Sequence, residues 1–344
     1  MRIAELFEPH HFRLAEGRIE EPGPGQVQVR VEAVGLCGSD LHYFAEGGIG
    51  DTPCAYPMVL GHEPAGTVMK TGPGVSGWFP GDRVALEPAI YCYHCEYCLT
   101  GRHNVCENIR FLSMPGDPGF LRDFVNLPAT NILPLPGNLS FEQGTLHEPL
   151  AIILHSMKIT AVQPQETAAV FGAGPIGLLT IAALKLCGAG RVWSIEPVAH
   201  RRALALAMGA DAAIDPAAVD PARQILHDTG QRGVDVSIDC AAKGGSLNHC
   251  VNITRNAGRV VITGIPSETH VSLEYHPVRR KELAILTVRR SNHDSEAALR
   301  LLRERPGLFA GMLTHTRPLE EVQAVFDMLE HYSDGVGKAV IALR

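Results

Sequence analysis

The stretch Val170-Phe171-Gly172-Ala173-Gly174-Pro175-Ile176-Gly177 decides the fold of the middle of this chain. It stands between an apolar run from Thr167, predicted to be a strand, and a predicted helix over Leu178–Leu186. Its spacing, G-x-G-x-x-G, is that of a turn that binds a dinucleotide, and Glu196 follows at the end of the next predicted strand. In this context the turn predicts a dinucleotide-binding unit with the pyrophosphate at the start of the helix.

Each glycine of the turn has a predicted role. Gly172 allows the tight turn, Gly174 lets the backbone approach the pyrophosphate, and Gly177 lets helix and strand pack closely. The alternative is a glycine-tolerant turn of an ordinary α/β protein. Glu196 favours NAD, because a carboxylate accepts hydrogen bonds from ribose hydroxyls and repels a 2'-phosphate. Arg201 and Arg202 leave NADP open, since an arginine can accept that phosphate, or they are ordinary charges that open the next helix.

Outward from this turn, apolar runs alternate with helical stretches from Thr167 to Val288, which indicates βαβ units and a parallel sheet. The first 150 residues differ: Val27–Val34 alternates with period two, and prolines and glycines separate further short strands. Two domains are therefore expected, in a fold of the α/β class.

The composition fits a folded protein without a nucleic-acid partner. The chain has 344 residues, of which 45% are hydrophobic and 19% charged, and a formal net charge of -7. The segment 168–184 lacks a formal charge, but its glycines and Pro175 would place a tight turn in the middle of a bilayer. Met1–Arg18 has no apolar signal core. We expect a soluble, cytoplasmic protein with no membrane partner.

Four of the nine cysteines form one local pattern, Cys92-x2-Cys95-x2-Cys98-x7-Cys106. Four thiolates on one polar loop satisfy tetrahedral Zn²⁺ with no open position, which predicts a structural zinc site. An iron–sulfur cluster also accepts such spacing, and buried free thiols are a further alternative.

A second set of ligand types is scattered over separate loops of the first half: Cys37, His62, Glu63 and Glu148. One thiolate, one imidazole and carboxylates can supply the three protein ligands and the open position of a catalytic zinc site. Spacing alone does not decide whether these residues bind a metal, because a lone His or Cys in such places is more often structural.

At these residues the sequence resembles the zinc-dependent medium-chain dehydrogenases/reductases. The resemblance rests on Gly35–Tyr43, Pro57–Glu63, the four-cysteine loop, Glu148-Pro149-Leu150 and the glycine turn, in that order. Cys-Gly-Ser-Asp-Leu-His-Tyr at 37–43, with Glu63 directly after His62, is most similar to the sorbitol/polyol dehydrogenase branch. The resemblance implies a GroES-like β-rich catalytic domain over 1–156, completed by 291–344, and a doubly wound Rossmann NAD-binding domain over 157–290.

The resemblance also implies roles for single residues. Cys37, His62 and Glu63 would hold a catalytic zinc, with Glu148 acting through water or by exchange, so that two zinc ions are expected per subunit. Asp40 would orient His62, and Ser39 and His42 would relay the proton. Tyr43, Phe111 and Arg290 would contact the substrate. The remaining residues would contact NAD: Gly172, Gly174, Ile176, Gly177, Glu196, Arg201, Thr263, Gly264, Ile265, Val288, Arg289 and Arg290.

The implied activity is reversible oxidation of a secondary alcohol of a polyol or sugar-like substrate to a ketone with NAD, by a homodimer or homotetramer. One alternative is a sugar-acid dehydrogenase of the idonate 5-dehydrogenase type, in which Arg289 and Arg290 pair with a carboxylate. Another is a zinc- and NAD-binding protein without activity, since a fold alone does not establish function.

Overall fold

The computed structural model describes all residues from 1 to 344 and divides the chain into two compact units. The first unit consists of Met1–Ala151 and Asn292–Arg344, and the second of Ile152–Ser291. The chain thus leaves the first unit, builds the second and returns. The boundary expected after residue 156 falls within helix α4 (His147–Thr160), which carries residues of both units. None of the helices combines the length and apolar character that crossing a membrane requires.

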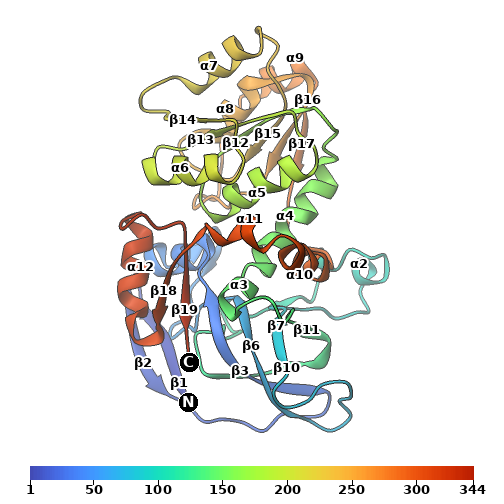
Figure 1. Cartoon of the computed structure of the whole chain (residues 1–344), viewed down its shortest axis with the longest axis vertical. Coiled ribbons are helices and arrows are strands. Elements are labelled where there is room, and N and C mark those ends of the chain that lie inside the picture. Colours follow the sequence, from blue (N-terminus) through green and yellow to red (C-terminus); the bar gives the residue numbers. More distant parts are fainter. The chain divides into compact units, whose positions relative to one another are not determined.

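The first unit is built on a seven-stranded sheet in the order β11-β7-β6-β3-β19-β18, with β10 also paired to β3. Strand β3 pairs antiparallel with β6 on one side and with β19 on the other. The C-terminal strands β18 and β19, red in Figure 1, therefore lie beside the blue β3. A sheet that begins near residue 26 is completed only near residue 342.

The strands of the first unit are β1 (Arg2–Glu8), β2 (His11–Glu16), β3 (Gln26–Gly35), β4 (Gly48–Ile49), β5 (Thr52–Pro53), β6 (Glu63–Thr71), β7 (Arg83–Leu86), β8 (Ala89–Ile90), β9 (Arg110–Phe111), β10 (Phe124–Pro128), β11 (Ile132–Pro134), β18 (Leu313–Pro318) and β19 (Lys338–Ala342). Its helices are short: α1 (Gly38–Leu41), η1 (His42–Glu46), α2 (Glu96–Leu99), η2 (His103–Val105), η3 (Ala129–Asn131), α3 (Phe141–Gly144), α10 (Ser295–Glu304), α11 (Pro306–Ala310), η4 (Leu319–Glu321) and α12 (Val322–Glu330).

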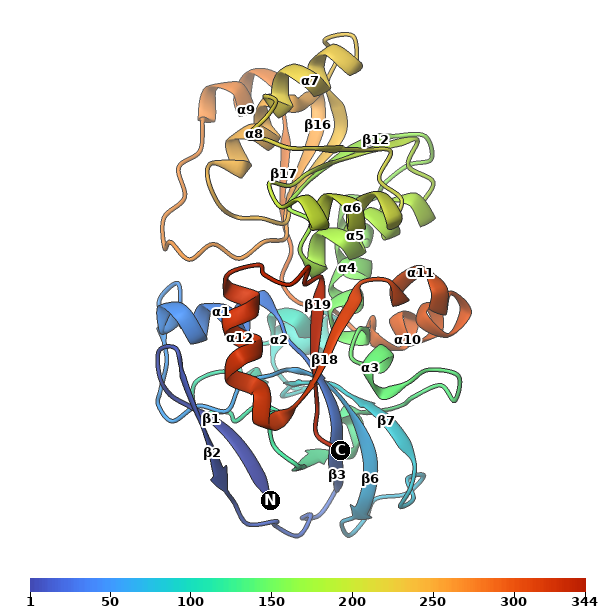
Figure 2. The same cartoon turned by 60° about the vertical axis from the view of Figure 1, so that its left-hand side comes forward.

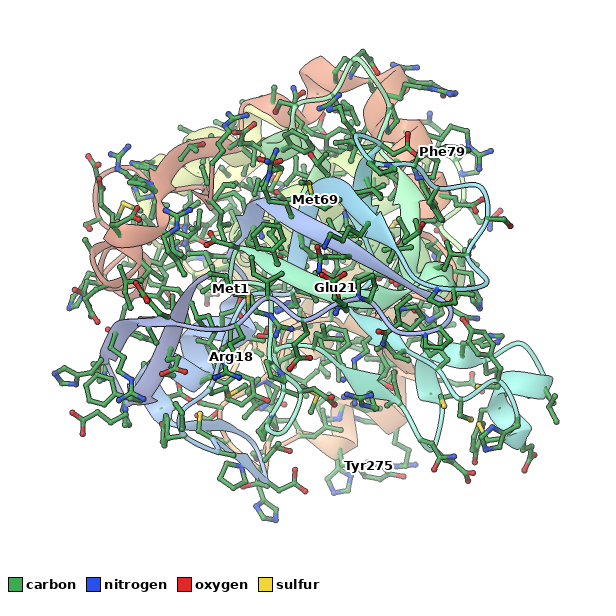
Figure 3. The ribbon with its side chains drawn as sticks, turned by 90° about the horizontal axis from the view of Figure 1, so that it is seen from below. Met1, Arg18, Glu21, Met69, Phe79 and Tyr275 are labelled. Carbon is green, nitrogen blue, oxygen red and sulfur yellow. The ribbon has the colours of Figure 1, made fainter.

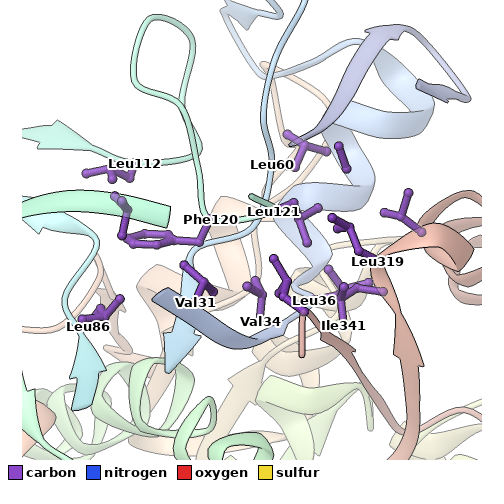
Figure 4. Packing of buried hydrophobic residues seen from close by; sticks show 14 of the residues in the cluster. Val31, Val34, Leu36, Leu60, Leu86, Leu112, Phe120, Leu121, Leu319 and Ile341 are labelled. Carbon is purple, nitrogen blue, oxygen red and sulfur yellow. The ribbon is translucent and has the colours of Figure 1, made fainter. Parts of the chain in front are cut away.

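The core of the first unit joins residues from both ends of the chain. Val31 and Val34, on β3, pack in one cluster with Leu121. Leu319 and Ile341, from the returning segment, belong to the same cluster (Figure 4). All five side chains are at most 1% exposed, so their burial fastens the returning segment to the sheet.

The second unit is a doubly wound α/β domain with a six-stranded sheet in the order β14-β13-β12-β15-β16-β17, all pairs parallel. The strands are β12 (Thr167–Phe171), β13 (Arg191–Ile195), β14 (Ala212–Ile214), β15 (Val234–Asp239), β16 (Thr254–Ile262) and β17 (Ala284–Thr287). The helices are α5 (Pro175–Leu186), α6 (Ala199–Ala207), α7 (Pro221–Asp228), α8 (Ser246–Ile253) and α9 (Tyr275–Lys281). Helices α5 and α6 contact the strands from β12 to β14, whereas α8 and α9 contact β16. Figure 2 labels these four helices together with β12 and β16.

In each unit, one aromatic side chain is more than 60% exposed. Phe79, between β6 and β7, is 66% exposed, and Tyr275, at the start of α9, is 63% exposed; both are labelled in Figure 3. Single exposed aromatic residues are common on folded proteins and need no functional explanation.

Candidate zinc and cofactor sites

The structure brings Cys37, His62 and Glu63 together. One potential ligand atom from each residue lies within 4.8 Å of those of the other two. Cys37 lies two residues after the end of β3 and caps the short helix α1, while His62 directly precedes β6 and Glu63 is the first residue of that strand. Because β3 and β6 are paired at Gly35 and Glu63, the two loops end side by side. A thiolate, an imidazole and a carboxylate at these separations fit a zinc ion with one position left open.

Asp40 holds this arrangement in place. Its Oδ2 accepts a hydrogen bond from the backbone N–H of Cys37 at 3.0 Å, and its Oδ1 accepts one from Gly61 at 3.1 Å. Oδ1 also lies 3.2 Å from Nδ1 of His62, which leaves Nε2 available to a metal. Burial opposes ionisation of Asp40, but the facing His62 and the backbone donors hold the pKa of this carboxyl below its usual value.

Ser113 is a further partner of Asp40 that sequence reasoning missed. Its hydroxyl donates to Oδ1 at 3.1 Å, and both side chains are buried. Ser113 adopts a left-handed backbone with φ of 83°, which is uncommon for a residue with a Cβ. No sequence pattern marks this position, because the contact joins residues 73 apart.

Glu148 lies in the first turn of α4 and is 5% exposed. Its Oε2 is buried without a hydrogen-bond partner. Burial raises the pKa of Glu148 to about 8. The charge of His62 acts in the opposite direction, and the repulsion of Glu63 adds to the effect of burial. Glu148 does not belong to the group of three ligand atoms that lie within 4.8 Å of one another.

The residues predicted to serve substrate and proton transfer lie on the segments around this group. The ring of Phe111 stands 5.5 Å from the ring of His62, measured between centroids. Ser39 lies within α1, and His42 opens η1 with its Nδ1 3.1 Å from Oε2 of Glu46. Tyr43 is 3% exposed and packs in the core cluster of the first unit.

The four cysteines of the loop between β8 and β9 converge as well. The Sγ atoms of Cys92 and Cys98, and those of Cys95 and Cys106, are 3.9 Å apart, and Cys106 lies 3.5 Å from Cys92. These separations are far longer than a disulfide bond of about 2.05 Å. They match the roughly 3.8 Å edge of a tetrahedron with Zn–S bonds of about 2.3 Å. Thiolates on the different irons of a cluster would stand further apart, so the geometry favours a single ion.

In the second unit, the glycine turn has the shape that its spacing predicts. Gly172 has φ of 90°, and a Cβ on Gly177 would overlap the carbonyl oxygen of Gly172. Around Gly174, which caps the start of α5, a Cβ would find only Nη1 of Arg201, at 4.0 Å. The backbone at Gly174 is therefore open to a ligand, with the helix N-terminus behind it.

Glu196 is tied to this turn. Its Oε2 accepts the backbone N–H of Ala173 at 2.7 Å, and its Oε1 accepts that of Val198 at 2.9 Å. The two arginines behind it differ: Arg201 is 8% exposed beside the turn, whereas Arg202 pairs with Asp215 at 2.9 Å. The pairing of Arg202 supports the interpretation in which this arginine is structural.

The remaining predicted cofactor residues follow β16 and β17. Thr263 and Gly264 donate their backbone N–H groups to the carbonyl of Asp239, and the hydroxyl of Thr263 is buried without a hydrogen-bond partner. Val288 donates its backbone N–H to Ile262 at 3.0 Å. Ile176 lies in the first turn of α5. Ile265 is 52% exposed, and Arg289 is exposed as well. Arg290 is half-buried with φ of 53°.

Comparison with known proteins identifies the family of each part of the chain. Residues 23–137 match the family described as alcohol dehydrogenase GroES-like domain, and residues 175–304 match the zinc-binding dehydrogenase family. Human sorbitol dehydrogenase is 35% identical over 336 residues, covering 97% of this chain and 93% of that protein. L-idonate 5-dehydrogenase of Vitis vinifera is 33% identical over 311 residues, covering 89% and 85%. A structure from Sinorhizobium meliloti 1021 solved with bound NADP has a TM-score of 0.89 and 30% identity, covering 99% of each chain.

Proposed function

Since the chain belongs to the zinc-dependent medium-chain dehydrogenases, in the sorbitol/polyol-like branch, we propose that it reversibly oxidises a secondary alcohol of a polyol or sugar-like substrate to a ketone, with NAD as the acceptor. The observation that carries the proposal is the convergence of Cys37, His62 and Glu63, since three ligands of these types suit a zinc that also binds substrate.

Cys37, His62 and Glu63 would hold the catalytic zinc, and the four-cysteine loop the structural one. When bound, zinc supplies Lewis-acid polarisation of the substrate hydroxyl, and the nicotinamide takes up the hydride. Ser39 would receive the hydroxyl proton and His42 would pass it on. The exposed carboxylate of Glu46 beside His42 supports a route to solvent. Glu148 would hold a water at the metal or replace it there, which its unpartnered buried Oε2 supports.

Around the reacting hydroxyl, Tyr43, Phe111 and Arg290 would contact the substrate. The ring of Phe111 beside His62 supports an apolar wall next to the metal. Such a wall suits the carbon chain of a polyol, and the hydroxyls of that chain need additional polar partners.

For the cofactor we propose NAD rather than NADP. Glu196, directly after β13, supports this, because its carboxylate would repel a 2'-phosphate. Arg201 beside Gly174 would then contact the pyrophosphate, together with Ile176, Gly172 and Gly177 of the turn and the backbone around Thr263, Gly264, Ile265, Val288 and Arg289. The test is to measure kcat/KM with NAD and with NADP, and a higher value with NADP would refute the proposal.

A second candidate is a sugar-acid dehydrogenase. It is favoured by the similarity to L-idonate 5-dehydrogenase and by the two adjacent arginines, Arg289 and Arg290, which could pair with a substrate carboxylate. The polyol interpretation has the broader support among the relatives, and it requires no carboxylate partner for either arginine.

The deciding experiment is an NAD-coupled screen of polyols, their matching aldonic acids and simple alcohols on zinc-loaded protein. Turnover of a polyol above its aldonic acid supports the proposal, and the reverse order favours the sugar-acid interpretation. No NADH formation on any substrate would leave a protein that binds zinc and NAD without activity. Cys37→Ser should abolish turnover, and Cys187→Ser, which changes an exposed thiol outside both metal sites, is the matched control.

We also propose that the protein acts as a homodimer or homotetramer in the cytoplasm. Strand β17 supports the assembly, because it forms an edge of the parallel sheet of the second unit and an edge strand can pair with a second chain. Sedimentation of the purified protein tests it; a monomer at micromolar concentration would contradict it.

A further inference from the structure

One lysine of the first unit is fully buried beside the proposed metal site. The side chain of Lys338, the first residue of β19, is 0% exposed. Its ammonium donates a hydrogen bond to the carbonyl oxygen of Leu36 at 2.9 Å and forms an ion pair with Oε2 of Glu63, whose side chain is also 0% exposed. Lysine is almost never fully buried unless it is paired, so the position calls for a reason.

The space around Oε2 of Glu63 is closed on the other side by Gly35. Strand β3 pairs with β6 so that Gly35 stands opposite Glu63, and a Cβ on Gly35 would overlap Oε2. The hydroxyl oxygen of Thr145 lies 3.1 Å from the place that this Cβ would take. The position of Oε2 is therefore fixed by the pairing of β3 with β6, by the absence of a Cβ on Gly35 and by the ammonium of Lys338.

The second oxygen of Glu63 is left for another partner. Both oxygens are buried and neither accepts a well-aligned hydrogen bond within the protein, but the ion pair with Lys338 is made through Oε2. A carboxylate oxygen of Glu63 is one of the three ligand atoms that approach one another within 4.8 Å. A carboxylate clamped through one oxygen presents the other in a defined direction, as partners of metal ligands do for histidine.

We propose that Lys338 is a positioning residue of the catalytic zinc site: its ammonium holds one oxygen of Glu63 so that the other is directed to the metal. The lysine also keeps Glu63 from being an isolated buried anion whenever the carboxylate leaves the metal. The proposal rests on the assignment of Cys37, His62 and Glu63 as zinc ligands.

A purely structural role is the competing explanation. A buried ion pair is a poor way to stabilise a fold, since apolar side chains of similar volume often do as well or better. A structural role would lower the stability of the first unit when the pair is removed, but it would leave the zinc affinity of correctly folded protein unchanged.

The experiment compares zinc affinity in wild type and Lys338→Met by competition with a chelator, and follows the site by the absorption spectrum of the cobalt-substituted protein. We expect at least about tenfold weaker binding at the Cys37 site, in the range found for partners of metal ligands, and a changed cobalt spectrum. The four-cysteine site is the internal control and should keep its metal. Lys70→Met, which removes an exposed lysine paired with Glu21, is the matched control and should bind both ions as wild type does.

Two further variants separate charge from folding. Lys338→Arg keeps the positive charge and should recover part of the affinity lost in Lys338→Met. Gly35→Ala leaves both charges but adds a Cβ where Oε2 lies, so it should weaken the same site. If Lys338→Met does not fold, Gly35→Ala decides in its place. The proposal would be overturned if the variant used for the test bound zinc at the Cys37 site as tightly as wild type does.

The readout also distinguishes this proposal from the proposed function. Failure of wild type to oxidise any polyol would refute the function, whereas the effect of Lys338 on zinc affinity is measured without substrate. If wild type bound only one zinc, at the four cysteines, the ligand assignment itself would be wrong, and the role of Lys338 with it.

Discussion

Asp40 orients His62: Oδ1 of the carboxylate lies 3.2 Å from Nδ1 of the ring, and both side chains are buried. The same oxygen accepts hydrogen bonds from the backbone of Gly61 and from the hydroxyl of Ser113. A single buried atom thus links the start of β6 with the loop after β9, and the other oxygen of the same carboxylate binds the loop of Cys37.

Asp40→Asn should weaken zinc binding at the Cys37 site by about tenfold, because the amide lacks the charge that fixes the ring of His62. Chelator competition measures this. Ser113→Ala removes only one of the donors to Oδ1 and should have a smaller effect in the same direction. Equal zinc affinity in Asp40→Asn and wild type would contradict the role of Asp40.

Cys95→Ser should reduce the zinc content from two ions per subunit to one and lower the midpoint of thermal unfolding by about 5 °C, since the loop between β8 and β9 has only a small cluster of its own. Metal analysis and calorimetry measure these effects. Cys187→Ser, on the surface of the second unit, should retain both ions. Iron instead of zinc in the wild-type protein would show that the loop holds a cluster.

Two substitutions in the glycine turn should separate folding from cofactor binding. Gly174→Ala adds a methyl group into open space, so the protein should fold normally and bind NAD at least about tenfold more weakly. Gly177→Ala drives a Cβ into the carbonyl of Gly172 and should destabilise the second unit by about 2 kcal/mol. Calorimetric titration with NAD and chemical denaturation measure the two effects. Undiminished NAD affinity in Gly174→Ala would place the pyrophosphate elsewhere.

Asp235 should make the second unit sensitive to acid. Burial opposes its ionisation, but hydrogen bonds from Arg232 and Arg255, each at 2.6 Å, and from Thr167 hold its pKa well below the ordinary 3.8. A pKa lowered by folding stabilises the folded state above the unfolded-state pKa, and this contribution is lost as the pH falls below about 4.

Asp235→Asn should therefore reduce the free energy of unfolding by about 2 kcal/mol at pH 7 and by progressively less below about pH 4. Urea denaturation at several pH values measures it, with Asp334→Asn on the surface as the control. A difference between wild type and variant that does not change with pH would contradict the assignment.

The sequence predicts those parts of the protein whose determinants are local. The glycine turn, the alternation of strands and helices after residue 167 and the four-cysteine spacing each lie within a short stretch, and each has the expected structure. Cys37, His62 and Glu63 could be grouped by ligand type, and family resemblance supplied their roles.

Contacts between distant segments could not be predicted in this way. Lys338 reaches Glu63 only because β19 pairs with β3, some 300 residues earlier in the chain. Ser113 reaches Asp40 through a left-handed backbone that no pattern requires. Arg202 was a candidate for a 2'-phosphate in the sequence, but the chain directly after β14 brings Asp215 beside it.

The interrupted first unit also has a consequence for biosynthesis. When residue 291 has been translated, every residue of the second unit exists, so that unit can fold as the ribosome continues. The first unit at that moment still lacks β18 and β19, and Glu63 lacks its ammonium partner. The second unit can therefore complete its sheet before the first unit can, and Lys338 can reach Glu63 only after the C-terminal strands have been made.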